Sequence, residues 1–300
     1  MDNPWVKRLL PWLIPLLLVG IAAYRMWPRS YLKADETLNM LIVGIEGVVT
    51  VESSPAVPDD SRPVVTSLAL LSIHPRHRSV HLLLIPTQIQ LPPDPDDPFA
   101  PYTEGRPLAE LVDGIGAQSL IEAVEHILGA PVHAALRTDV LSLQTLVHRE
   151  GGLELPVDIA AVGIEGVVGN AAEPVQGQSV PTARFSGEEV AAYVDPDRYS
   201  DGETLLAAQG AVFRAGLQVI RSMYRMVNLE ALFERGHRYF ETELDRNVLL
   251  DVAKHLYTAD PGRIWLDVLP GTFEGETFRI DTDAVRRLVE RVYLEPNFWQ

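Results

Sequence analysis

Short apolar runs separated by polar turns dominate the first half of the chain after residue 37. Residues 38–43 (LNMLIV), 64–73 and 80–85 (VHLLLI) are such runs, and each ends at glycine, proline or a polar cluster. Runs of this length between turn residues are typical of buried strands. The turn between the second and third runs, residues 74–78 (HPRHR), is short and polar, so we predict that these two strands form a hairpin.

Amphipathic stretches follow from residue 118 onward. Residues 118–128 carry apolar positions at helical spacing and end at Gly129, and Asp139 is a candidate N-cap for a helix over 139–148. Ser186 and Glu189 have the spacing of a capping box that opens a helix over 187–194. Further helices are predicted at 204–226, 228–233, 245–257 and 281–292, with strands at 153–158 and 265–269. The pattern predicts an α/β fold, a mixed central sheet with helices on both faces, in a single domain over 38–294.

The N-terminal region has a different pattern. Residues 9–24 contain no charged side chain, and residues 9–27 are long enough to span a bilayer if Arg25 reaches the interface. We therefore expect a short cytoplasmic tail over 1–8, a transmembrane anchor over 9–27 and a linker over 28–37. Lys7 and Arg8 favour a cytoplasmic N-terminus and an extracytoplasmic body at the cell membrane. A cleaved signal peptide is the alternative, although Ile21 interrupts the small-residue pattern before Ala22 and Ala23.

Charge and cysteine content narrow the function classes. The formal net charge is −16, and residues 1–34 contribute +4, which leaves −20 on the rest of the chain. A body this acidic disfavours nucleic acid as a partner. The chain has no cysteine, which excludes disulfides, thiolate metal sites and cysteine nucleophiles.

Candidate chemistry is sparse. The common nucleotide-binding, hydrolase and zinc-protease motifs do not occur, and we interpret His74, His77 and His81 as part of a polar turn. The loop after residue 194 is richer in charge. Asp195, Asp197 and Asp201 are either turn-forming side chains or ligands of a divalent cation.

An ordered set of segments resembles the LytR-CpsA-Psr family of cell-envelope proteins. Any one segment is weakly specific, but the order matches over about 38–294, and one N-terminal membrane helix also fits the family. The matching segments are 39–44 (NMLIVG), 67–75 (SLALLSIHP), 80–86 (VHLLLIP), 116–129, 136–140 (LRTDV), 146–156 (LVHREGGLELP), 185–194 (FSGEEVAAYV) with Gln209 downstream, and 269–271 (LPG).

The resemblance implies a function in cell-wall biogenesis. Members resemble transferases that move a glycopolymer from an undecaprenyl-pyrophosphate carrier to peptidoglycan. The resemblance also implies an α/β/α fold with an apolar tunnel for the polyprenyl lipid. It further implies a Mg²⁺ ion that bridges pyrophosphate to acidic residues, and arginines that bind the phosphates. Guanidinium groups suit that role because they bind phosphate oxygens in pairs.

This chain departs from the family at those positions. The family's metal-binding aspartate matches Thr66, and its arginine and aspartate after the hairpin match Thr87 and Gln88. Its later arginines match Asp195, Asp197, Leu206 and Ala208, while Gln209 is retained. Replacing a phosphate-binding arginine by aspartate introduces repulsion where attraction is needed.

Two functional hypotheses follow from the departures. The first is a non-catalytic homologue, a pseudoenzyme, that binds a lipid-linked glycan, a lipid or a protein partner near Thr66, Thr87, Gln88 and Gln209. The alternative is an active phosphotransferase with a rebuilt site, for which Arg106 and Arg198 are the catalytic candidates.

Overall fold

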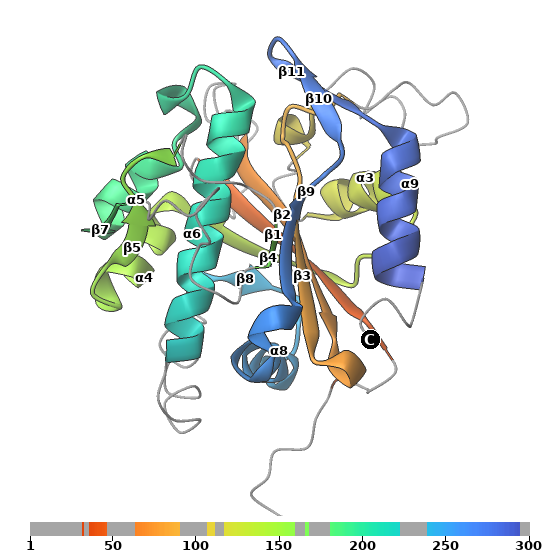
Figure 1. The fold of residues 1–300 in the computed structure, drawn as a ribbon, viewed down its shortest axis with the longest axis horizontal. Coiled ribbons are helices and arrows are strands. Elements are labelled where there is room, and N and C mark those ends of the chain that lie inside the picture. Colours follow the sequence, from red (N-terminus) through yellow and green to blue (C-terminus); the bar gives the residue numbers. More distant parts are fainter. Residues whose placement is uncertain are drawn as a thin grey trace, which may run out of the picture.

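The computed structural model describes residues 32, 36–46, 64–90, 107–111, 117–159, 166–167, 181–222 and 239–294. Within this part, a seven-stranded mixed sheet has the strand order β6-β9-β3-β2-β1-β4-β8 (Figure 1). β2 pairs antiparallel with both β1 and β3. β4 pairs parallel with β1, and β9 pairs parallel with β3. The strands are β1 (Leu38–Glu46), β2 (Val64–His74), β3 (Ser79–Leu84), β4 (Ala134–Asp139), β6 (Gly166–Val167), β8 (Glu241–Thr242) and β9 (Ile264–Val268).

Helices cover both faces of this sheet, because the central strands bury side chains on both sides. On β1, Leu41 and Val43 pack toward α3 (Gln118–Leu128) and α9 (Thr282–Val289), while Met40 packs on the opposite side. The opposite side is covered by α6 (Gly202–Ser222) and α8 (Arg246–Thr258). A strand buried on both faces reads as a continuous apolar run, which explains the pattern of residues 38–43.

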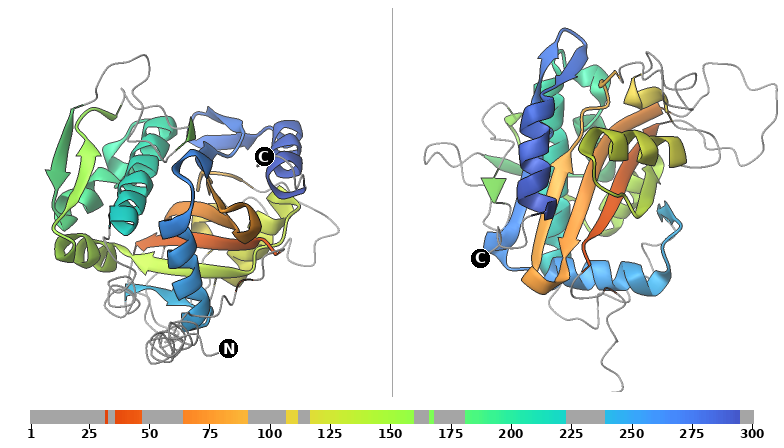
Figure 2. Two further views of the ribbon diagram at one scale, coloured as in Figure 1. Left: turned by 60° about the horizontal axis from the view of Figure 1, so that its bottom comes forward. Right: turned by 90° about the vertical axis from the view of Figure 1, so that its right-hand side faces the viewer.

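A smaller unit packs against the far side of α6. It contains α4 (Val140–Arg149), α5 (Gly187–Tyr193) and the two-stranded sheet of β5 (Leu153–Pro156) and β7 (Thr182–Phe185) (Figure 2). Small residues of α6, among them Ala208 and Ala211, form an apolar core with Leu155 and Val190 of this unit. α6 therefore lies between the central sheet and the smaller unit.

Short elements complete the described part. The β10–β11 hairpin lies beyond the end of β9, and a π-helical turn follows α9 (Figure 1). Their bounds are η2 (Pro75–His77), η3 (Leu108–Glu110), η6 (Pro196–Arg198), η8 (Pro261–Arg263), β10 (Gly271–Glu274), β11 (Thr277–Ile280) and η9 (Glu290–Leu294).

The predicted central sheet, its hairpin and the helices on both faces are confirmed. Asp139 caps α4 through the Ser142 amide, and Ser186 and Glu189 form the capping box of α5. The strands β4 and β7 and the hairpin of β10 and β11 were not predicted. Their residues mix charged and apolar types, and they become strands through pairing with distant segments.

Several predictions fall outside the described residues. These are the anchor over 9–27, the helix over 228–233 and the position of Arg106. Among the residues that the structure describes, no helix combines the length and apolar character needed to cross a bilayer.

Candidate functional site

The candidate site lies at the end of the sheet where β1 ends and β2 begins. Gly44 pairs with Ser67 and Ile45 pairs with Val65, so Thr66 is the extra residue of a β-bulge. The Thr66 hydroxyl donates a hydrogen bond to the Gly44 carbonyl at 3.4 Å. A side chain at Gly44 would place its Cβ 2.2 Å from the Ser67 hydroxyl, so glycine permits this close pairing. The bulge turns Thr66 out of the regular ladder.

Gln209 of α6 makes a second contact to this bulge, at the Thr66 backbone. Its Nε2 donates a hydrogen bond to the Thr66 carbonyl at 2.9 Å, and its side chain is buried. The contact joins residues 143 positions apart and satisfies a carbonyl that the bulge frees from the ladder. The structure therefore brings together Thr66 and Gln209, two of the residues predicted for the site.

Thr87 and Gln88 lie at the same end of the sheet, just after β3. The Thr87 carbonyl accepts a hydrogen bond from the Ala109 amide of η3, and the Gln88 carbonyl accepts one from the Phe278 amide of β11. η3 also contacts β2, and Thr87 itself is buried. Thr87 and Gln88 are therefore held in a backbone network between two neighbouring segments.

The acidic loop, residues 194–201 between α5 and α6, leads into Gly202, the first residue of α6, which lies at this end of the molecule. The first residue of α6 lies against the Phe273 ring of β10, and Phe273 stacks edge-on with Phe278 at 4.9 Å. Phe278 is the residue whose amide binds Gln88. The loop and the Thr87–Gln88 segment thus contact the same hairpin.

The carboxylates of this loop serve as caps for local structure. Asp195 accepts a hydrogen bond from the Asp197 amide at 3.0 Å, and Asp201 accepts from both the amide and the hydroxyl of Thr204. These bonds, the backbone one foremost, lower the pKa of Asp201. Arg198 is exposed and donates to the Ala192 carbonyl at 3.3 Å.

The structure shows Asp195 and Asp201 in the first of their two predicted roles, as turn-forming side chains that cap nearby amides. No group of three or more histidine, aspartate and glutamate side chains is arranged to hold a metal ion in the part of the chain described above. The physical reason is that Asp195 and Asp201 face the backbone amides that they cap. Thr66 offers a hydroxyl in place of the carboxylate that Mg²⁺ prefers, and Gln209 turns its amide nitrogen toward the bulge. These residues do not fit the Mg²⁺ site that the resemblance implies.

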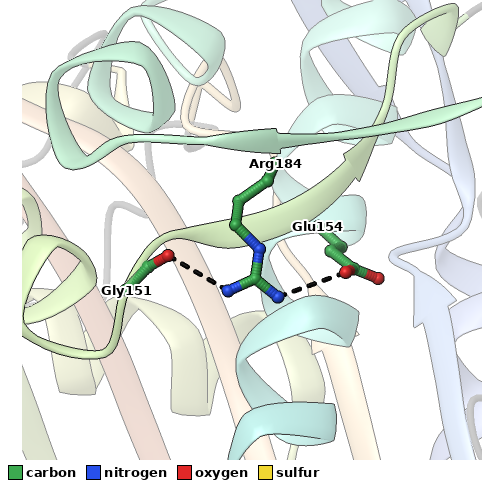
Figure 3. Close-up of polar contacts among 3 residues, drawn as sticks. All are labelled: Gly151, Glu154 and Arg184. Carbon is green, nitrogen blue, oxygen red and sulfur yellow. Dashed lines mark hydrogen bonds and ion pairs between the residues drawn. The ribbon is translucent and has the colours of Figure 1, made fainter.

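Arg184 is a basic side chain that the sequence analysis did not single out. Its guanidinium, on β7, donates to the Gly151 carbonyl at 3.1 Å and to the Glu154 carboxylate at 3.2 Å (Figure 3). Both partners lie at or before β5, so Arg184 joins the two strands of the small sheet. Both side chains are largely exposed, so this ion pair adds little to stability.

Comparisons with known proteins identify solved structures that share this fold. No protein-family model matches the chain, and no curated protein matches it. Several solved structures do match. TagV of Bacillus subtilis is 16% identical with a TM-score of 0.64, and the match covers 86% of this chain and 97% of TagV.

Two further solved structures agree with TagV. The LytR-Csp2A-Psr enzyme of Actinomyces oris is 17% identical with a TM-score of 0.60, over 88% of this chain and 92% of the enzyme. TagT bound to LIIa-WTA is 14% identical with a TM-score of 0.58, over 87% of this chain and 92% of TagT. The resemblance to the LytR-CpsA-Psr family is thereby confirmed at the level of the fold.

Proposed function

We propose that this protein is a membrane-anchored cell-envelope protein that uses the LytR-CpsA-Psr fold for binding rather than for phosphotransfer. The body, residues 38–294, acts as one extracytoplasmic domain, and its ligand is a lipid-linked glycan of the cell wall. TagT, which shares the fold, is known in complex with LIIa-WTA, and this supports a ligand of that class.

One observation carries the non-catalytic part of the proposal. The groups at the family's phosphate and metal positions form hydrogen bonds within the protein itself. The Thr66 hydroxyl donates to the Gly44 carbonyl, Gln209 donates to the Thr66 carbonyl, and the Asp195 carboxylate accepts from the amide of its own loop. Phosphoryl transfer depends on cationic groups and metal ions that neutralise the developing charge. Thr66 and Asp195, which replace a family carboxylate and a family arginine, supply neither.

A second candidate function is phosphotransfer at a rebuilt site. Arg198 favours it, since this side chain is exposed in the loop that precedes α6, whose first residue, Gly202, lies against Phe273 of β10. Arg106 would be the second cation of such a site.

The two functions are separated by one set of assays on the full-length chain in detergent. LIIa-WTA is offered with Mg²⁺ and peptidoglycan, and both binding and transfer are measured, with TagT assayed in parallel for binding. We expect binding without transfer, and Arg198→Ala and Arg106→Ala should leave that result unchanged. Transfer by the unmodified chain that either arginine substitution abolishes, while Arg287→Ala on α9 does not, would establish the rebuilt transferase instead.

A further inference from the structure

A basic surface lies at the end of the sheet opposite the candidate site. We call it the basic end and define it by Arg76, His77 and Arg78 at the turn between β2 and β3, together with Arg263 of η8. The Arg263 guanidinium donates to the His77 carbonyl at 3.0 Å, and the Asp260 amide donates to the Arg78 carbonyl at 3.4 Å. Arg76 and Arg78 are exposed. The two turns therefore form one continuous surface.

The charge of the basic end contrasts with the rest of the body. Asp260 is an acidic residue in contact with it, through its backbone amide, and the Asp260 carboxylate caps the Gly262 amide. The body as a whole carries a formal charge of −20 once the +4 of residues 1–34 is removed from −16. A cationic surface on so acidic a protein indicates an anionic partner.

The N-terminal part of the chain joins the body beside this surface. The Leu32 amide donates to the Asp251 carboxylate of α8 at 3.3 Å, and Asp251 is only 3% exposed. Leu32 packs in the same apolar cluster as Leu256 and Ala259 at the end of α8, which contact the β2–β3 hairpin. α8 runs across the lower end of the molecule in the right-hand view of Figure 2. Asp251 thus fixes the entering chain next to the basic end.

Only a few residues separate this junction from the apolar segment. From Trp27 to Leu32 an extended chain reaches at most about 17 Å. The sequence of the junction adds Arg25, Arg29 and Lys33, against the acidic residues at 35 and 36, which leaves it net positive. If residues 9–27 span the membrane, the bilayer surface lies within that reach of Leu32, on the side of the body that carries the basic end.

We propose that the basic end docks on the anionic phospholipid head groups of the membrane that holds the anchor. This rests on the proposed membrane localisation and is independent of the ligand at the candidate site. Basic residues near an anionic bilayer each add to the attraction, and the effect fades over a Debye length. Docking therefore fixes the orientation of the domain, with the basic end down and the candidate site away from the bilayer.

Site-specific labelling tests the proposal on the full chain. Because the chain has no cysteine, Thr258→Cys beside the basic end and Thr272→Cys on β10 each accept one fluorophore. The protein is reconstituted in vesicles of phosphatidylcholine, with or without phosphatidylglycerol, that carry a nitroxide on their head groups. We expect quenching of the label at residue 258 in the vesicles with phosphatidylglycerol, relieved by salt, and little quenching at residue 272.

Charge reversal supplies the matched control. Arg76→Glu with Arg78→Glu should lower the docked fraction about tenfold or more, while Arg286→Glu with Arg287→Glu on α9 makes the same change in net charge and should alter it less than about twofold. Equal quenching at residue 258 with and without phosphatidylglycerol would overturn the proposal, and so would equal effects of the two double variants.

Failure of the anchor is recognised separately. A chain that does not float with phosphatidylcholine vesicles lacks the anchor, which removes the localisation on which the proposed function rests. Docking is then measured by flotation with phosphatidylglycerol vesicles. Binding that is lost in the double variant Arg76→Glu with Arg78→Glu supports docking through the basic end, and absence of binding overturns the proposal.

Discussion

His74 is a buried histidine at the last position of β2, and its surroundings favour the neutral ring. Its Nδ1 lies 3.1 Å from the Thr37 hydroxyl, and its side chain is 7% exposed. Burial, and then the positive charge of nearby His81 and His77, lowers the pKa of His74 from 6.5 to about 4. His81 in turn lies 2.8 Å from the Asp267 carboxylate. Protonating His74 in the folded protein therefore costs free energy.

The pH dependence of stability follows from that lowered pKa. The unfolded chain binds a proton at His74 below pH 6.5, whereas the folded protein resists it until about pH 4. The stabilisation is complete above pH 6.5 and is lost as the pH falls, by up to about 3 kcal/mol. We expect His74→Gln to flatten the decline in unfolding free energy between pH 7 and pH 5, measured by urea titration. His126→Gln, at an exposed position of α3, is the control, and an equal slope in wild type and His74→Gln would contradict the assignment.

Gln209 makes a testable contribution to the folded state. Gln209→Ala removes the donor to the Thr66 carbonyl and leaves a half-buried acceptor without that bond, so we expect a loss of about 1–2 kcal/mol in unfolding free energy. Urea denaturation measures it. Gln218→Ala, at an exposed position of the same helix, should change the value by less than about 0.5 kcal/mol. Equal values for the two variants would show that the bond to the bulge adds nothing to stability.

At the scale of elements, two consecutive glycines set the link from α4 to β5. Gly151 and Gly152 have φ angles of 80° and 93°, a region open mainly to glycine. Gly152 and Gly129 both have positive φ angles, but they differ in the space around them. A Cβ at Gly152 would lie 2.6 Å from the Phe185 carbonyl, whereas Gly129, with a φ of 62°, has nothing within 4 Å of its added Cβ. Gly152 therefore combines conformational and steric constraints.

The pair of glycines allows these two effects to be separated. Gly129→Ala should cost about 1 kcal/mol for its left-handed backbone alone, and Gly152→Ala should cost about 2 kcal/mol more because the backbone of β7 must move. Thermal and urea unfolding give both values. Similar losses for the two variants would indicate that the close approach of β5 and β7 relaxes at little cost.

Local elements were predictable from the sequence, whereas the contacts that build the site were not. Asp139 and Ser186 were recognisable as helix caps because a cap binds a backbone amide only three residues further along the chain. The bond from Gln209 to Thr66 spans 143 positions, and the bulge depends on the register between β1 and β2. Neither leaves a periodic signal. Asp195 and Asp201 fit two patterns in the sequence, turn-forming caps and cation ligands, and the structure shows both of them capping nearby amides.

On the scale of the whole molecule, the two ends of the central hairpin carry different surfaces. β2 begins beside Thr66 at the candidate site and ends at the turn that carries Arg76 and Arg78. Its 11 residues span about 35 Å at the rise of an extended strand. If the basic end docks on the membrane, the candidate site stands about 30 Å above the head groups. That height favours contact with the glycan of a lipid-linked ligand over contact with the part of the lipid that stays in the bilayer.

An arginine at position 87, where the family carries one, is not expected to restore activity on its own. Thr87→Arg should not create transfer of LIIa-WTA to peptidoglycan with Mg²⁺, because Thr87 is buried and its segment is fixed between η3 and β11. Burying a guanidinium at a site that now holds a threonine desolvates its charge, so the melting temperature should also fall. Gln88→Arg is the matched variant. Gln88 is more exposed than Thr87, so it should keep the melting temperature and still show no transfer, since a single cation does not replace the missing metal carboxylate at Thr66. Transfer by either variant, measured with labelled LIIa-WTA, would mean that one arginine is all that separates this chain from an enzyme.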